Sequence, residues 1–184
     1  MSDTLKMGLK LLLITVIATF ALALTQMITE EPIKVQAEKA ENEAKAAVLE
    51  GAEEFVQLEV SKETYPNILE AHKGMVDGNT KGYTFKTFNS GYGGQIVVIV
   101  GIDTEGTITG MRIVQQTETP GLGAKAQESD FYEQYYGKPG SSPLANDDIN
   151  AITGATVTSN AVTDAVNYAI DYYRAELVSG GGSQ

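Results

Sequence analysis

The pattern of apolar and polar positions divides the chain into three parts. Residues 11–29 form an apolar run without a charged side chain. The next stretch is rich in Ala, Glu and Lys, and its spacing predicts a helix from about Pro32 to Glu50, with the proline in its first turn. This helix could also continue the apolar run as a stalk. From about residue 59 onward, strand-like runs alternate with turn residues until a final amphipathic helix.

The apolar run has the length of a membrane span. As a helix it would extend about 28 Å, close to the ~30 Å hydrocarbon core of a bilayer. Two lysines precede it and two glutamates follow it, so we expect the N-terminus in the cytoplasm and the main domain on the extracytoplasmic side. A cleavable signal peptide is the alternative, because "ALA" at 21–23 resembles a cleavage site, although cleavage there would leave apolar residues behind. The pattern favours a single-pass anchor in the cell (inner) membrane.

Four strand-like runs predict an antiparallel-rich sheet. The turns "VDGN", "NSGYGG" and "DTEG" separate them, and "IVVIV" is apolar on both faces, as expected of a central strand. A short helix is expected at "SDFYEQYYG", and the last helix from about Ser159 to Leu177 carries an apolar stripe that should pack on the sheet. The predicted fold class is α+β: a single N-terminal transmembrane helix followed by an antiparallel-rich sheet packed with flanking helices. The predicted strands are 68–76, 82–89, 94–102 and 107–116.

The same patterns predict the domain organisation. Composition changes after the apolar run, and the period changes again where the strands begin. The expected segments are a cytoplasmic N-terminus with a transmembrane helix (1–29), a stalk with an N-terminal helix (30–58), an extracytoplasmic domain (59–178) and a flexible tail (179–184).

Composition excludes several classes of function. The chain has 24 acidic and 13 basic residues, a net charge of −11, and an acidic surface of this kind repels nucleic acid. It contains no cysteine, which rules out disulfides, thiolate zinc sites and cysteine-ligated iron–sulfur clusters. The one histidine, His72, lies in a predicted strand and is expected to be structural. No metal site is predicted.

The stretch "NAITGATVTSNAV" (150–162) carries the candidate chemistry, because it leads into the last helix. It offers four hydroxyls, on Thr153, Thr156, Thr158 and Ser159. One hypothesis is a helix cap, in which Ser159 or Thr158 accepts a hydrogen bond from a backbone N–H further along. The other is an anion site, because a helix N-terminus suits a phosphate and Gly154 and Ala155 leave the Thr156 hydroxyl unhindered. From these residues alone both hypotheses stay open.

"TGAT" before an amphipathic helix resembles the S/T-G-A-T motif of the covalently flavinylated FMN-binding domains. The stretch "GYGGQIVVIVGIDTEGTITGMRIVQQTETPGLG" resembles the rest of that family's pattern: a glycine-rich start, a strand pair around a D-x-x-G turn, and E-T-P-G-L-G. With the membrane anchor in front, the order and spacing resemble the G subunit of Rnf-type complexes over nearly the whole chain. One departure is Asn150, where the family usually has Asp; Asp147 and Asp148 lie just upstream.

This resemblance implies a covalent cofactor. FMN would be joined through its phosphate to Thr156 by a separate flavin transferase that consumes FAD. The chain would relay electrons, together with other membrane and peripheral subunits, in a complex that couples ferredoxin:NAD electron transfer to sodium or proton translocation. It would be an electron-transfer subunit that is not catalytically complete alone, with no catalytic acid, base or nucleophile. The cofactor-binding residues so implied are Thr153, Gly154, Ala155, Thr156, Thr158 and Ser159, and Glu118, Thr119, Pro120, Gly121, Leu122, Gly123 and Lys125.

Two other interpretations remain. The C subunit of the sodium-translocating NADH:quinone oxidoreductase shares both motifs, although that subunit is usually longer. A non-redox anchored module for binding or assembly would use "TGAT" only as a helix cap. A covalent FMN would exclude the second interpretation, and the identity of the partner subunits would decide the first.

Overall fold

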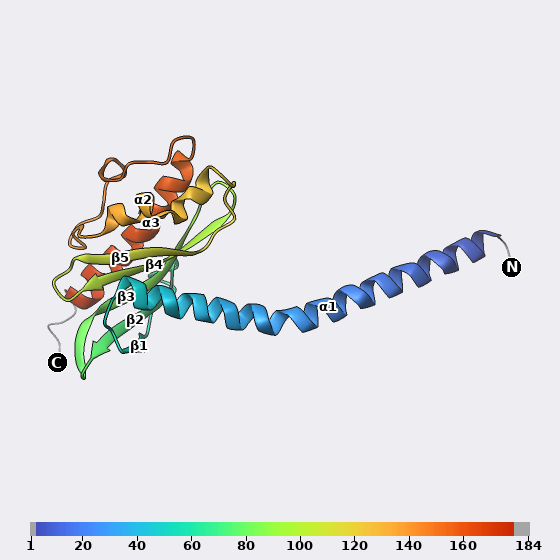
Figure 1. The fold of residues 1–184 in the computed structure, drawn as a ribbon, viewed down its shortest axis with the longest axis horizontal. Coiled ribbons are helices and arrows are strands. Elements are labelled where there is room, and N and C mark those ends of the chain that lie inside the picture. The colour runs from blue at the N-terminus through green and yellow to red at the C-terminus, as the bar shows by residue number, and fades with distance from the viewer. Residues whose placement is uncertain (1–2, 179–184) are drawn as a thin grey trace. The chain divides into compact units, whose positions relative to one another are not determined.

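A computed structural model describes residues 3–178, and the predicted tail at 179–184 lies outside the described residues (Figure 1). The chain divides into two compact units, one ending at Ala40 and one beginning at Glu41. The helices are α1 (Asp3–Val48), α2 (Ser129–Tyr132) and α3 (Thr156–Tyr172), and the strands are β1 (Glu54–Leu58), β2 (Ile68–Val76), β3 (Asn79–Ser90), β4 (Gln95–Asp103) and β5 (Ile108–Gln115). Short 3-10 turns occur at Gly123–Gln127, Glu133–Tyr135 and Asn146–Asp148, and a π-helical turn at Tyr173–Val178 follows α3.

The N-terminal apolar run forms part of one helix, α1, that continues through the expected stalk to Val48. An 18-residue window of this helix has a mean hydropathy of 2.3, and none of that window is buried. By length and composition, this is a helix that can cross a membrane. Pro32 lies inside this helix and not in the first turn of a separate one. The stalk therefore continues the apolar segment, as the second of the two sequence interpretations proposed.

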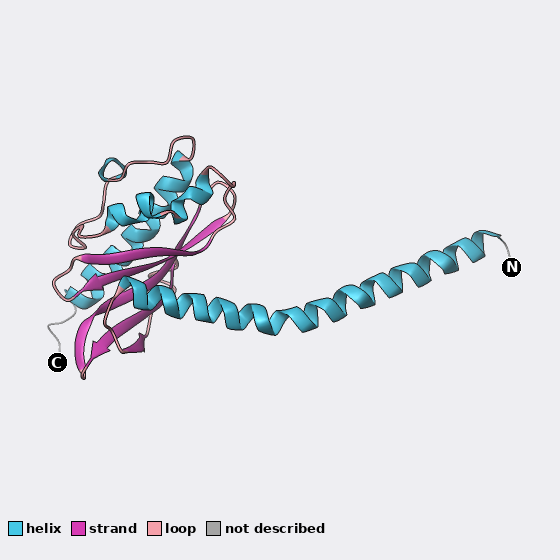
Figure 2. Ribbon diagram, in the orientation of Figure 1, coloured by secondary structure: helices cyan, strands magenta, loops and turns pink. Residues whose placement is uncertain are grey.

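The five strands form one antiparallel sheet in the order in which they occur along the chain (Figure 2). The four predicted strands are confirmed, and β2 has the predicted bounds. The structure adds β1, which the sequence had assigned to the stalk segment. Since β1 is a short edge strand with no fully buried residue, it lacks the apolar signal that identifies the strands inside the sheet.

Strand β4 lies between β3 and β5 and is buried on both faces. On one face its residues join the main core with the apolar stripe of α3, as the stripe predicted. On the other face Ile99 packs with Ala44 and Val48 from the last turns of α1. The core side chains contributed by β4 and α3 are Ile96, Val98, Val100, Ile102, Ala161, Val162, Ala165, Val166, Ala169, Ile170 and Tyr172.

Candidate functional site

The "TGAT" motif lies in the turn that leads directly into α3. Gly154 has a φ of +78°, a left-handed conformation that a residue with a side chain rarely adopts. Thr156 is the first residue of α3 and is exposed. The first intrahelical hydrogen bond of the helix runs from the Ser159 N–H to the Ala155 carbonyl at 3.0 Å, and no side chain caps the helix at Ala155. The N–H groups of the first helical turn therefore remain available to an anion.

The hypothesis that Thr158 or Ser159 caps the last helix is wrong. Because α3 begins at Thr156, three residues before the predicted start, Thr158 and Ser159 lie inside the first turn and not ahead of it. The Ser159 hydroxyl accepts from the Ile152 N–H at 2.9 Å and donates to the Ala155 carbonyl at 3.1 Å, so it braces the turn that precedes the helix. The Thr158 hydroxyl donates to the side chain of Glu118, 40 residues earlier in the chain.

A buried carboxylate, Glu118, connects three segments that are distant in the sequence. Its Oε2 accepts from the Thr158 hydroxyl at 2.6 Å, and its Oε1 accepts from the Gly93 N–H in the turn between β3 and β4 at 2.9 Å. Gly123 packs against the same carboxylate: a Cβ there would lie 2.6 Å from both Glu118 Oε2 and Thr158 Oγ1. Only glycine fits this close approach without displacing the pair. Glu118 therefore fixes how the start of α3 lies against both loops.

These segments enclose a pocket of about 650 Å³, called the Thr156 pocket below. This volume is within the ~300–1,000 Å³ range of small-molecule sites. The pocket combines a helix N-terminus with apolar side chains, the combination that a ligand with a phosphate and an apolar ring requires. Its lining residues are Tyr92, Glu118, Thr119, Leu122, Gly123, Gly154, Ala155, Thr156, Val157 and Thr158.

Most of the predicted site residues meet in this pocket, but some do not. Ser159 is buried and does not line the pocket, and the other predicted residues outside the lining are Thr153, Pro120, Gly121 and Lys125. Lys125 lies within the 3-10 turn at Gly123–Gln127. The sequence missed Tyr92 and Val157. Val157 directly follows Thr156, and Tyr92 lies in the glycine-rich start of the family pattern, so both positions could have been proposed from the sequence.

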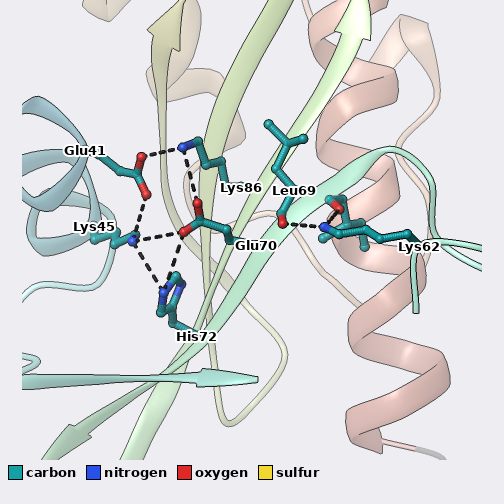
Figure 3. Close-up of polar contacts among 8 residues, drawn as sticks. Glu41, Lys45, Lys62, Leu69, Glu70, His72 and Lys86 are labelled. Carbon is teal, nitrogen blue, oxygen red and sulfur yellow. Dashed lines mark hydrogen bonds and ion pairs between the residues drawn. The ribbon is translucent and has the colours of Figure 1, made fainter. Parts of the chain in front are cut away.

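Another concentration of ionisable groups lies on the α1 side of the sheet and is called the helix-end cluster here (Figure 3). It comprises Glu41 and Lys45 from α1, Glu70 and His72 from β2, and Lys86 from β3. Lys45 Nζ lies 2.8 Å from Glu41 Oε1, 3.5 Å from Glu70 Oε2 and 3.5 Å from His72 Nε2. Lys86 forms ion pairs with both glutamates. No group of three or more His, Asp or Glu residues that could hold a metal occurs within residues 3–178.

Burial and pairing shift the ionisation of this cluster. Burial lowers the pKa of His72, and the nearby Lys45 charge lowers it further. Burial alone would raise the pKa of Glu41, but hydrogen bonds from Lys45 and Lys86 outweigh it and lower the pKa below 4.5. Burial opposes the charge on Lys86, yet Glu41 and Glu70 raise its pKa above 10.5. The cluster therefore holds opposite charges that compensate one another.

A larger cavity, of about 780 Å³, is lined by residues of β1, the loop that follows it, the start of β2 and the C-terminal end of α3 with the turn after it. Polar contacts hold the residues around it: the Tyr65 hydroxyl donates to Glu176 at 2.8 Å. Lys62 donates to the backbone carbonyls of Ile68 and Leu69 (Figure 3). Its lining includes no helix N-terminus and none of the predicted site residues. Volume alone therefore does not identify the site.

Comparison with known proteins gives a family match to the part of the chain that contains the Thr156 pocket. Residues 91–171 match the model of the FMN-binding domain family, and every residue that lines the pocket falls within this segment. Over 92% of its length, the chain is 36% identical to the G subunit of the Na⁺-translocating ferredoxin:NAD⁺ oxidoreductase complex of Acetobacterium woodii, 91% of which is covered. The chain belongs to the family of G subunits of ion-translocating oxidoreductase complexes.

Further similarities extend this assignment. The chain is 32% identical to the G subunit of the ion-translocating oxidoreductase complex of Methanosarcina acetivorans, with 93% of this chain and 95% of that one covered. Among solved structures, the C subunit of the Na⁺-translocating NADH-quinone reductase from Parabacteroides distasonis superposes with a TM-score of 0.52 at 20% identity, covering 72% of this chain and 79% of that one. At 20% identity, the similarity to the quinone-reductase C subunit shows only that the two proteins share a fold.

Proposed function

We propose that this chain is a membrane-anchored flavoprotein subunit that carries FMN on Thr156 and relays electrons within an Rnf-type ion-translocating complex. The observation that carries the proposal is that Thr156 is exposed at the uncapped start of α3 and lines a pocket of suitable size. The relatives are G subunits along almost their whole length, which favours this function over that of a quinone-reductase C subunit.

The residues present fit FMN joined through a phosphoester. The phosphate would lie at the N-terminus of α3, where N–H groups and the helix dipole stabilise negative charge without a basic side chain. Exposed Leu122 and Val157 offer apolar surface for the isoalloxazine ring. Bound FMN supplies reversible electron transfer. The chain's own residues bind and orient it, and none of them needs to act as an acid, base or nucleophile in the electron transfer.

Attachment would require a separate flavin transferase. In that reaction the Thr156 oxygen forms a bond to the FMN phosphorus of FAD, the diphosphate bond of FAD breaks, AMP leaves, and the hydroxyl proton is released. The covalent link has a physical advantage, because a dissociable cofactor outside the cytoplasm would be lost by dilution.

The membrane arrangement follows from charge. We propose that α1 anchors the chain in the cell membrane with the N-terminus in the cytoplasm, since Lys6 and Lys10 flank the apolar run on that side. The segment from Glu41 onward would then function on the extracytoplasmic side, next to the other membrane subunits of the complex. Alone, the chain is expected to hold and pass electrons but not to oxidise ferredoxin or reduce NAD.

Intact mass tests the attachment. Coexpressed with a flavin transferase, the full-length chain is expected to gain the mass of FMN minus water, and Thr156→Val is expected to abolish this gain completely. Thr153→Val is the matched control in the same motif and should retain it, since Thr153 does not line the pocket. An unmodified wild-type chain, or a modified Thr156→Val chain, would overturn the proposal.

A further inference from the structure

Exposed apolar side chains gather around the Thr156 pocket. Beyond α1, the large apolar side chains that remain exposed in the described residues are Val56, Leu69, Tyr92, Leu122, Val157 and Val178. Tyr92, Leu122 and Val157 all line this one pocket, and Tyr92 is the most exposed of the six at 77%. Single exposed apolar residues are ordinary on protein surfaces, but several around one concave pocket mark a ligand-binding surface.

The backbone that carries Tyr92 is held in place although its side chain is exposed. The turn between β3 and β4 is closed by a backbone hydrogen bond of 2.7 Å. The next residue, Gly93, is tied in two directions: its N–H donates to Glu118 Oε1 at 2.9 Å, and its carbonyl accepts from the Thr117 hydroxyl at 3.0 Å. Glu118 also accepts from Thr158 in the first turn of α3. The same carboxylate therefore positions both Tyr92 and the start of the helix.

We infer that Tyr92 is a flavin-contacting residue, whose phenol ring packs against the isoalloxazine ring of FMN attached at Thr156. The inference rests on the proposed function, because it needs a flavin at that threonine. A phosphoester tether fixes only the phosphate end of the cofactor, and the ribityl chain leaves the ring free to rotate. Contacts from the pocket must therefore order the ring, and among the described residues Tyr92 is the one aromatic side chain in its lining.

Flavin fluorescence tests this contact directly. A phenol in contact with an excited flavin donates an electron and takes it back, which quenches the emission without net chemistry; a phenylalanine ring does not. The full-length chain is coexpressed with a flavin transferase as wild type, Tyr92→Phe and Tyr92→Ala. Tyr65→Phe is the matched control, because it removes a phenol that lines a different cavity.

All four proteins are expected to carry FMN by intact mass. Tyr92→Phe and Tyr92→Ala should raise the flavin emission several-fold, and Tyr92→Ala should also weaken the circular dichroism of the visible flavin band, which reports ring order. Tyr65→Phe should match the wild type. If Tyr92→Ala loses its flavin, Tyr92→Phe decides alone, because it keeps the volume of the ring.

The two proposals fail in different ways. Flavin-loaded Tyr92→Phe with the emission and lifetime of the wild type would overturn the contact while leaving the attachment at Thr156 intact. A wild-type chain without FMN would remove the basis of both.

Discussion

The helix-end cluster and the Thr156 pocket both bury charge, but they compensate it differently. In the cluster, two glutamates face two lysines and a histidine, all within 3.7 Å of a neighbour. At the pocket, Glu118 is compensated by neutral donors, Gly93 N–H and the Thr158 hydroxyl. The cluster lies at the end of α1 and on two strands, whereas the pocket combines a helix N-terminus with exposed apolar side chains.

This difference separates structural charge from functional geometry. The cluster joins the last turns of α1 to β2 and β3, and its positive and negative side chains form ion pairs with one another. At the pocket, the buried carboxylate holds loops in place and leaves the lining free for a ligand. The dense group of ionisable side chains therefore stabilises the scaffold of this domain, whereas the proposed cofactor site has few charges and an uncapped helix N-terminus.

Removing a partner from the helix-end cluster should produce the largest loss of stability. Lys45 is only 7% exposed, and Lys45→Met would leave Glu41 and Glu70 facing each other with one lysine between them. Breaking a buried ion pair in this way costs about 3 kcal/mol. Denaturant unfolding of the full chain measures this loss, and flavin loading should be unchanged.

The control for this prediction is Lys81→Met at an exposed position, which should change the free energy of unfolding by less than about 0.5 kcal/mol. A similarly small change in Lys45→Met would contradict a structural role for the cluster. If Lys45→Met kept the wild-type free energy of unfolding but lost its flavin, the helix-end cluster would serve cofactor binding and not stability.

Glu118→Ala should have a smaller effect on stability but a direct effect on the pocket. It leaves the Thr158 hydroxyl buried without its acceptor, a loss of about 2 kcal/mol for hydrogen bonds to a charged group. It also releases the turn that carries Gly93, so the visible circular dichroism of attached flavin should weaken. Glu118→Gln is the matched control.

In Glu118→Gln the amide oxygen can still accept from the Gly93 N–H, and the hydroxyl of Thr158 can rotate to accept from the amide nitrogen. Most of the stability and of the flavin signal should therefore return. Equal damage in both variants would show that the charge matters and not the hydrogen bonds.

The smallest effect is expected in the pH dependence of stability. The pKa of His72 is lowered from 6.5, so below that pH the unfolded chain binds more protons than the folded one. Stability should thus fall as the pH drops from 6.5 through the folded-state pKa, and His72→Gln should flatten this slope. Glu41, with its pKa lowered from 4.5, adds a further loss at more acidic pH.

Unfolding curves recorded at a series of pH values measure the slope. The groups that face His72 are Lys45 and Glu41 from α1, Glu70 from β2 and Lys86 from β3. On the alkaline side Lys86 stabilises the folded state below 10.5 and loses this effect as the pH rises through its raised pKa, in the wild type and in His72→Gln alike. Identical acid slopes in the two proteins would show that His72 does not titrate with folding.

The sequence predicted those parts of the fold whose signal is local. Strands β2 to β5 carry buried apolar positions between recognisable turns, whereas β1 is an exposed edge strand and left no such trace. The start of α3 was placed three residues late, because hydroxyl residues usually cap helices, and here Ser159 instead braces the preceding turn.

The candidate site was predictable only where motif residues are neighbours in the chain. "TGAT" and "ETPGLG" both reach the pocket, yet what brings them together is the bond between Glu118 and Thr158, 40 residues apart. Tyr92 enters through a contact that spans 25 residues, from Gly93 to Glu118. Neither periodicity nor spacing encodes such pairings, which depend on how the loops pack.

The order of the sheet bears on how the protein matures. Each strand pairs with its neighbour along the chain, so the sheet can assemble from hairpins with little loop closure. In the folded chain the turn at Thr156 is held against the loop that carries Glu118 by the hydrogen bond from Thr158, which joins residues 40 positions apart. A flavin transferase that recognises only the folded turn would leave incompletely folded chains unmodified. Under the proposed function, only chains with a completed fold would then receive FMN.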